Sequence, residues 1–394
     1  MNKLKFNIQK LYLIKALQYF MLSMPIIVLF FNDHHGLSFM DIMILKSIYS
    51  FSIAILEIPS GIFADYIGKK TSIVLGCFFM FFGFLLFSYF SNYEVFIIAE
   101  ILLATGSSMI SGSDSALLYD SLIKLKSEKN YTKIEGANYS VGNFSEAIAG
   151  ILGGFLASFS LLLPIYIQTG VLFSCILVSI TLIEPINNNQ KVNSIINNIF
   201  NNVIYILKFN RKLLWIILFS SIMGLASLST AWLVQPYLIE INLTAESFGI
   251  IWAFLNVTAG IGSFYSFKIE KHNTLNKIII YSSILISIPL LILFFQLNIF
   301  GIVFLFLIYL IRGIIHPILK NNINIITQTN IRSTILSIRN FGIRVSFAII
   351  SPILGYLADL DKGINFSFLV LFLIFSLCTI FLIVLKLFWV DKKK

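Results

Sequence analysis

Charged side chains occur inside apolar runs that are long enough to cross a membrane. An ionisable group at membrane depth is costly, so such a residue is a candidate functional residue by default. Burial raises the pKa of a carboxyl group toward physiological pH, which suits it to bind and release a proton. We therefore predict that Glu100 couples proton movement to function, with Glu57, Glu146 and Asp114 as alternates.

Helical spacing groups several polar residues on common faces, because residues three, four and seven apart lie on one side of an α-helix. Two interpretations of Glu100 stay open, since it either carries the proton or neutralises a buried cation such as Lys46. The spacing predicts one stripe of Glu100, Ser107, Ser111 and Asp114, and a second stripe of Tyr309, Arg312, His316 and Lys320.

The cations at membrane depth are Lys46, Arg312, Arg339 and Arg344, and they outnumber the acids that stand clear of the helix ends. Uncompensated cations are costly in a low-dielectric setting, so they are paired with acids or they receive an anionic ligand. Arg312 is the residue expected to bind this ligand, because a guanidinium binds a carboxylate through two hydrogen bonds. A carboxylate-bearing ligand is one prediction, and an amphipathic, cationic or neutral compound is the alternative.

The composition excludes a soluble globule, because 58% of the 394 residues are hydrophobic and only 12% are charged. The chain is predicted to be an integral membrane protein. Its net charge of +10 would suggest nucleic acid in a soluble protein, but here the basic residues stand in short loops, where they set topology. Cys77, Cys175 and Cys378 lie in apolar runs without paired spacing, so we expect packing residues and neither a metal nor a cofactor.

A membrane-spanning helix needs about 20 apolar residues, and twelve runs meet this requirement. The predicted fold class is therefore all-α integral membrane, with both chain ends on one side. The runs lie near 11–31, 38–60, 70–90, 95–119, 137–160, 164–184, 212–238, 247–267, 275–297, 299–320, 333–358 and 364–389.

A polar, Asn-rich stretch divides the twelve predicted helices into six and six. Weak self-similarity at one constant offset supports a duplication, for example Gly154-Phe155-Leu156-Ala157 against Gly355-Tyr356-Leu357-Ala358. We predict two pseudo-symmetric six-helix bundles, one over 1–184 and one over 212–394, joined by a cytoplasmic linker over 185–211.

A short polar hinge joins the second and third apolar runs. Gly61 and Gly68 suit a tight turn, Asp65 is expected to accept hydrogen bonds from the first turn of the next helix, and Lys69 and Lys70 mark the cytoplasmic side. The order G-x-x-x-D-x-x-G-K-K resembles the signature loop of the major facilitator superfamily. The preceding E-x-P-S-G, and S-G-S-D-S-A-L-L-Y-D-S-L further along, resemble the drug:proton antiporter branch with twelve helices.

This resemblance implies a central cavity lined by the first, fourth, seventh and tenth helices, and a gating role for the hinge. The sequence departs from the family pattern at Tyr66 and at Glu100, where the family commonly places arginine, and the acid at 100 puts the usual antiporter mechanism in question. The predicted cavity residues are Gln18, Lys46, Trp232, Gln235, Asn256, Tyr309, Arg312, His316 and Arg344.

The sequence contains no HExxH, G-x-S-x-G or P-loop pattern, so an ATP-driven pump or a membrane protease is not expected. The prediction is a secondary active transporter, and not an enzyme, that moves a small organic solute by alternating access, with proton-coupled efflux of a drug or metabolite as the mode. The alternatives are export or import of an anionic carboxylate metabolite such as a siderophore, and a lipid flippase on the same scaffold.

The expected partners are a small-molecule substrate, protons and the lipid bilayer, and the expected state is a monomer without nucleic acid. The 28 Lys and Arg residues are distributed unevenly between the two sides of the membrane. Nearly all of those in loops fall on one predicted side, including Lys3, Lys5, Lys10 and Lys15, whereas the loops on the opposite side hold only Lys362. This asymmetry predicts a multi-pass protein of the bacterial inner membrane with both termini cytoplasmic.

Reporter fusions at Lys10 and Lys392 test this orientation. Both fusions are expected to give the cytoplasmic signal, because basic loops are retained on that side during insertion. A periplasmic signal from either end would contradict the predicted topology.

Overall fold

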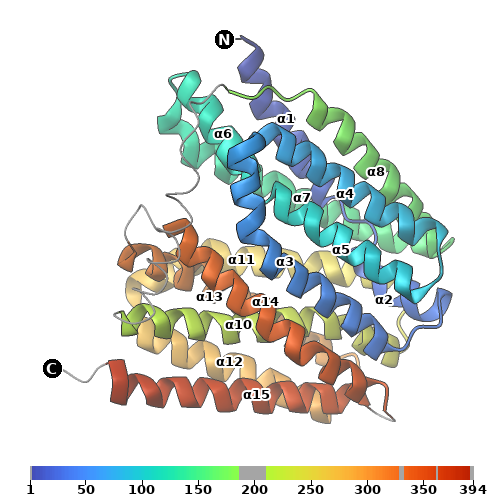
Figure 1. Cartoon of the computed structure of the whole chain (residues 1–394). Coiled ribbons are helices and arrows are strands. Elements are labelled where there is room, and N and C mark those ends of the chain that lie inside the picture. Colours follow the sequence, from blue (N-terminus) through green and yellow to red (C-terminus); the bar gives the residue numbers. More distant parts are fainter. Residues whose placement is uncertain (1, 186–209, 328–331, 361–362, 391–394) are drawn as a thin grey trace. The chain divides into compact units, whose positions relative to one another are not determined.

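The computed structural model describes residues 2–185, 210–327, 332–360 and 363–390, and the regular elements in these ranges are helices (Figure 1). Twelve helical segments among the described residues are long and apolar enough to cross a membrane. This confirms the predicted all-α membrane fold with twelve spans.

The helices of the first half are α1 (Asn2–Tyr19), η1 (Met24–Ile26), α2 (Ile27–Leu29), η2 (Phe30–His34), α3 (Phe39–Ile67), α4 (Lys69–Tyr89), α5 (Tyr93–Ile110), α6 (Ser113–Lys124), η3 (Glu128–Asn130), α7 (Tyr131–Ala157) and α8 (Leu162–Ile180). Those of the second half are α10 (Arg211–Glu240), α11 (Ala245–His272), α12 (Leu275–Phe295), α13 (Gly301–Ile326), α14 (Arg332–Ala358), α15 (Gly363–Leu385) and η5 (Lys386–Val390).

Contacts divide the chain into two compact units. One unit comprises Met1–Gly36, Ile48–Val192 and Thr244–Ala253, and the other comprises Leu37–Ser47, Asn193–Leu243 and Phe254–Lys394. The first residues of α3 therefore pack with the second unit and those of α11 with the first. The predicted linker 185–211 lies almost entirely outside the described residues, so the bundle boundaries stay a prediction.

The first span is broken, although the sequence predicts one helix over 11–31. Helix α1 ends at Tyr19, and the backbone N–H of Leu22 donates to the side chain of Gln168 at 2.8 Å. A Cβ added to Gly153 of α7 would lie 2.0 Å from the carbonyl oxygen of Leu22. Only glycine leaves room for this close approach, so Gly153 and Gln168 together accommodate the break.

The fourth span is also broken, at a glycine with a left-handed backbone. Helix α5 ends at Ile110 and α6 begins at Ser113, while Gly112 between them has a φ of 78°. The predicted stripe from Glu100 to Asp114 is therefore wrong as one continuous helical face, because this turn changes the helix direction and register before Asp114.

The hinge between α3 and α4 differs from the prediction in its acceptor. Gly68 has a φ of 106°, and the backbone N–H groups of Lys69 and Lys70 donate to Glu184 at 3.0 and 2.6 Å. The expectation that Asp65 caps this turn is wrong, because α3 continues to Ile67 and leaves Asp65 exposed on its last turn. The gating role of Gly61, Asp65, Gly68, Lys69 and Lys70 stays a prediction.

Glycine contacts set the distance between α4 and α5. A Cβ added to Gly76 would lie 2.8 Å from the carbonyl oxygen of Gly106, and one added to Gly106 would lie 2.5 Å from that of Gly76. The two backbones are thus in direct contact, which small residues allow at interfaces between membrane helices.

Gly76→Ala is expected to destabilise the protein by about 1 to 3 kcal/mol, because overpacking forces the backbones apart. The matched control is Gly170→Ala on α8, where an added Cβ meets nothing within 4 Å and where alanine favours the helix. Unfolding of the detergent-purified variants measures the difference. Equal stability of the two variants would contradict the predicted contact.

Candidate functional site

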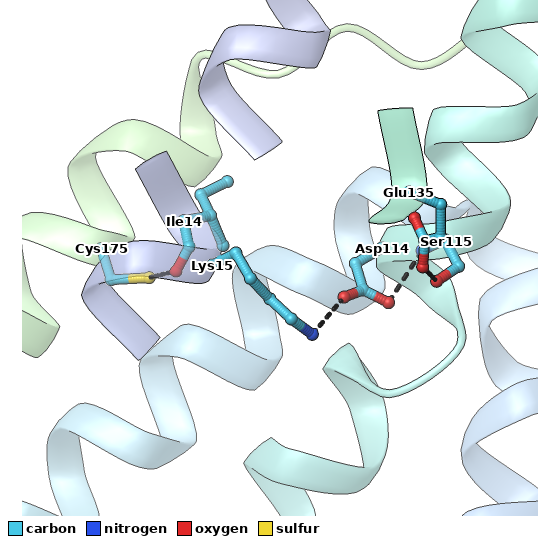
Figure 2. A network of polar contacts seen from close by, with 6 residues as sticks. All are labelled: Ile14, Lys15, Asp114, Ser115, Glu135 and Cys175. Atoms are coloured by element: carbon cyan, nitrogen blue, oxygen red, sulfur yellow. Dashed lines mark hydrogen bonds and ion pairs between the residues drawn. The ribbon is translucent and has the colours of Figure 1, made fainter. Parts of the chain in front are cut away.

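A network of polar side chains joins α1, α6 and α7 in the first unit (Figure 2). The Lys15 ammonium lies 3.1 Å from a carboxylate oxygen of Asp114. The backbone N–H of Ser115 donates to the other oxygen of Asp114 at 2.7 Å, and the Ser115 hydroxyl donates to Glu135 at 2.5 Å. One basic and two acidic side chains are therefore connected through a single serine.

Local structure explains how this network is held. Asp114 lies in the first turn of α6, directly after the turn at Gly112, where the positive end of the helix dipole favours a carboxylate. The Lys15 ammonium lies 4.8 Å from the centre of the Tyr19 ring, one turn further along α1. The side chains of Lys15 and Asp114 are only 17% and 9% exposed, so the ion pair is largely shielded from solvent.

Two neighbouring side chains of α7 each have a buried oxygen atom without a hydrogen-bond partner. These atoms are Oε2 of Glu135 and Oδ1 of Asn138, which lies one turn further along the helix. Burial, followed by the negative charge of Glu135, raises the pKa of the nearby Tyr131. A buried acceptor without a donor is costly. The two unpartnered oxygens therefore mark this turn of α7 as a candidate site for a further donor.

A second network lies in the other unit, between α10, α13 and α14. Arg339 Nη2 lies 3.2 Å from His316 Nδ1, and His316 Nε2 lies 3.3 Å from the hydroxyl of Ser227. The Ser227 hydroxyl itself donates to the carbonyl oxygen of Met223 at 2.8 Å. Because a guanidinium only donates, these contacts assign the proton of a neutral His316 to Nε2.

The remaining predicted site residues are spread over several helices. The structure brings Lys46 to Trp232, with the ammonium 5.1 Å from the ring, and Arg312 to Tyr309, with the guanidinium 5.2 Å from the ring. Glu100 and Gln235 are buried, whereas Gln18, Glu57, Glu146, Asn256 and Arg344 are half-buried.

Lys15 and Glu135 are absent from the site residues that the sequence predicts. Lys15 belongs to the basic residues of the predicted inner face, although it stands within the apolar run 11–31, where the criterion that selects Lys46 applies to it equally. Glu135 precedes the predicted helix 137–160, but α7 begins at Tyr131 and so includes it.

No group of three or more His, Cys, Asp or Glu side chains in the described part of the chain is placed to hold a metal ion. The buried thiols of Cys77 and Cys175 are free and lie 3.3 Å apart. They join α4 to α8 by packing.

Comparisons with known proteins agree with this architecture. The sequence profile of the Major Facilitator Superfamily matches residues 11–333. The chain is 25% identical over 342 residues, 84% of either protein, to the uncharacterised MFS-type transporter YxaM of Bacillus subtilis (strain 168).

Two solved structures share the fold. A nucleoside transporter, NupG, aligns with a TM-score of 0.75 at 14% identity over 100% of both chains. A D-xylose–proton symporter aligns with a TM-score of 0.74 at 13% identity, over 96% of this chain and 97% of the other.

Lys15→Met is expected to lower the free energy of unfolding by roughly 3 kcal/mol, because it leaves the Asp114 carboxylate without its counterion. The double variant Lys15→Met/Asp114→Leu should recover most of this loss. The control is Lys5→Met, which removes an exposed charge from the same helix. Denaturant unfolding in detergent measures these three variants and Asp114→Leu alone, and strictly additive losses would contradict a coupled pair.

Proposed function

Because the chain belongs to the Major Facilitator Superfamily, a family of transporters, we propose that it is a secondary active transporter that exchanges a small organic solute for protons by alternating access. Export is the proposed direction. It is supported by the E-x-P-S-G hinge and by the acidic segment around Asp114, both of which resemble the drug-efflux branch. The inner membrane, cytoplasmic termini and a monomeric state are part of this proposal.

The observation that carries the proposal is the network of Lys15, Asp114, Ser115 and Glu135. With both carboxyl groups ionised, one lysine leaves a net charge of −1 within membrane-spanning helices. One bound proton makes the network neutral. We assign the coupling role to Glu135, because its Oε2 is buried and accepts no hydrogen bond.

Proton binding is able to drive transport through its effect on conformational energy. A proton that binds more tightly in one access state than in the other shifts the equilibrium between the two states. Ser115 connects Glu135 to Asp114, so a change of charge at Glu135 is felt by the ion pair that ties α6 to α1. The proton thereby acts on the packing of three helices.

The nature of the solute is proposed from two directions. The solved relatives transport a nucleoside in one case and, with protons, D-xylose in the other, as their names state. Both are small organic solutes, which supports a solute of similar size here. Glu100, Glu57 and Glu146 remain alternative proton carriers, because each lies within a membrane-spanning helix.

Purified protein in liposomes with a trapped pH-sensitive dye tests the proposal against a panel of nucleosides, sugars, organic acids and lipophilic cations. The wild type is expected to move protons when one solute class is added, and Glu135→Gln should fall to the level of empty liposomes because it cannot exchange the proton. The matched control is Glu94→Gln, which removes an exposed carboxyl group from α5.

Two results would contradict this account. If no solute moves protons in the wild type, the proton-coupled function fails. If Glu135→Gln retains solute-driven proton flux and Glu100→Gln loses it, then the coupling group is Glu100 and the network around Lys15 is structural.

A further inference from the structure

The membrane-spanning helices of the second half are almost free of acids. The sequence contains no Asp or Glu from residue 275 to residue 358, a range that covers α12, α13 and α14. Asp359 follows α14 and accepts hydrogen bonds from the backbone N–H groups of Phe39 and Met40. Glu270, near the end of α11, accepts from Asn321 and Asn322. These carboxylates are engaged at helix ends.

Arg339 is a cation in this acid-free region. It is only 7% exposed, its Nη2 donates to the uncharged ring of His316, and its Nε–H has no hydrogen-bond partner. A buried guanidinium that is held by a neutral partner retains the full cost of its charge. It also retains a free donor with a defined direction.

The hydrogen-bond chain fixes this guanidinium in place. Arg339 donates to His316, His316 donates to Ser227, and Ser227 donates to the carbonyl oxygen of Met223. Each donor and acceptor in the chain has one role, so His316 cannot supply a negative charge and cannot turn without breaking two contacts. The arginine is therefore preorganised, which lowers the cost of binding a ligand.

A hydroxyl group on α10 adds a further donor. Thr230 lies three residues after Ser227, about one helical turn away, and therefore on the same face of α10. Its side chain is fully buried, and its hydroxyl has no hydrogen-bond partner. A positive charge with unpartnered N–H and O–H groups on neighbouring helices matches the hydrogen-bonding requirement of an oxyanion.

We propose that Arg339, held in place by His316 and Ser227, binds the carboxylate or phosphate group of a soluble organic anion, and that this anion is the transported solute. The identity of this anion as the transported solute rests on the proposed transport function. Arg312, which the sequence suggested as the anchor, lies one turn before His316 on α13 with its guanidinium near the Tyr309 ring. It provides positive potential, and Arg339 provides the direct contact.

Binding of benzoate, citrate and inorganic phosphate to detergent-purified protein tests the site, with calorimetry for affinity and thermal unfolding for stability. At least one of these anions is expected to bind the wild type, and Arg339→Met should weaken that binding about tenfold or more, as expected for a lost charged hydrogen bond. Lys320→Met is the control, since it removes an exposed cation from the helix that carries His316.

A second readout separates ligand binding from a structural role. Without ligand, Arg339→Met should melt at the wild-type temperature or above it, because it removes a buried charge that has no counterion in these helices. A purely structural arginine would instead melt lower when replaced. His316→Asn should also weaken anion binding, because it releases the guanidinium from its fixed orientation.

The proposal is overturned if none of the three anions binds, if Arg339→Met and Lys320→Met weaken binding equally, or if Arg339→Met melts well below the wild type. It is also overturned if only phosphatidylglycerol, compared with phosphatidylcholine in nanodiscs, stabilises the protein in an Arg339-dependent way. Solute-driven proton flux with a neutral or cationic solute would leave the proposed transport function standing while removing the anion as its substrate.

Discussion

The cost of placing a charge in hydrocarbon is the constraint on which the rest of this structure depends. The ion pair of Lys15 and Asp114, at 3.1 Å, meets this cost in the first unit. Other features serve that pair: the turn at Gly112 starts α6 so that Asp114 lies in its first turn, and α1 presents Lys15 to it. Ser115 then extends the pair to a second carboxylate, Glu135, on α7.

The two units meet the same constraint by different means. In the first unit two carboxylates and one lysine are connected, and the proposed proton coupling is based on this excess of one carboxylate. In the second unit the helices from 275 to 358 carry arginines without acids, and Arg339 is held by the neutral His316. We therefore propose the first unit as the site of the proton and the second as the site of the anion. A transporter that couples the two would change the charge of both units during each cycle.

The sequence predicts the spans well because about 20 apolar residues are needed to cross a bilayer and few other segments have that property. It predicts the breaks poorly, since these depend on tertiary contacts such as the approach of Gly153 to Leu22. The same limit applies to side-chain partners. Glu184 is distant in sequence from the turn at Lys69 that it caps, so the sequence points to the nearby Asp65 as the cap instead. Arg339 and Lys15 were visible as charges, but their partners on other helices were not.

Proton linkage of solute binding is the most direct measurement of the central claim, namely that the network around Glu135 exchanges one proton with the solute. Calorimetric titration of the wild type with its solute, in buffers that differ in ionisation enthalpy, gives the number of protons taken up or released on binding. The account predicts that the observed heat changes with the buffer in the wild type and is independent of the buffer in Glu135→Gln. Identical heats in all buffers for the wild type would contradict it.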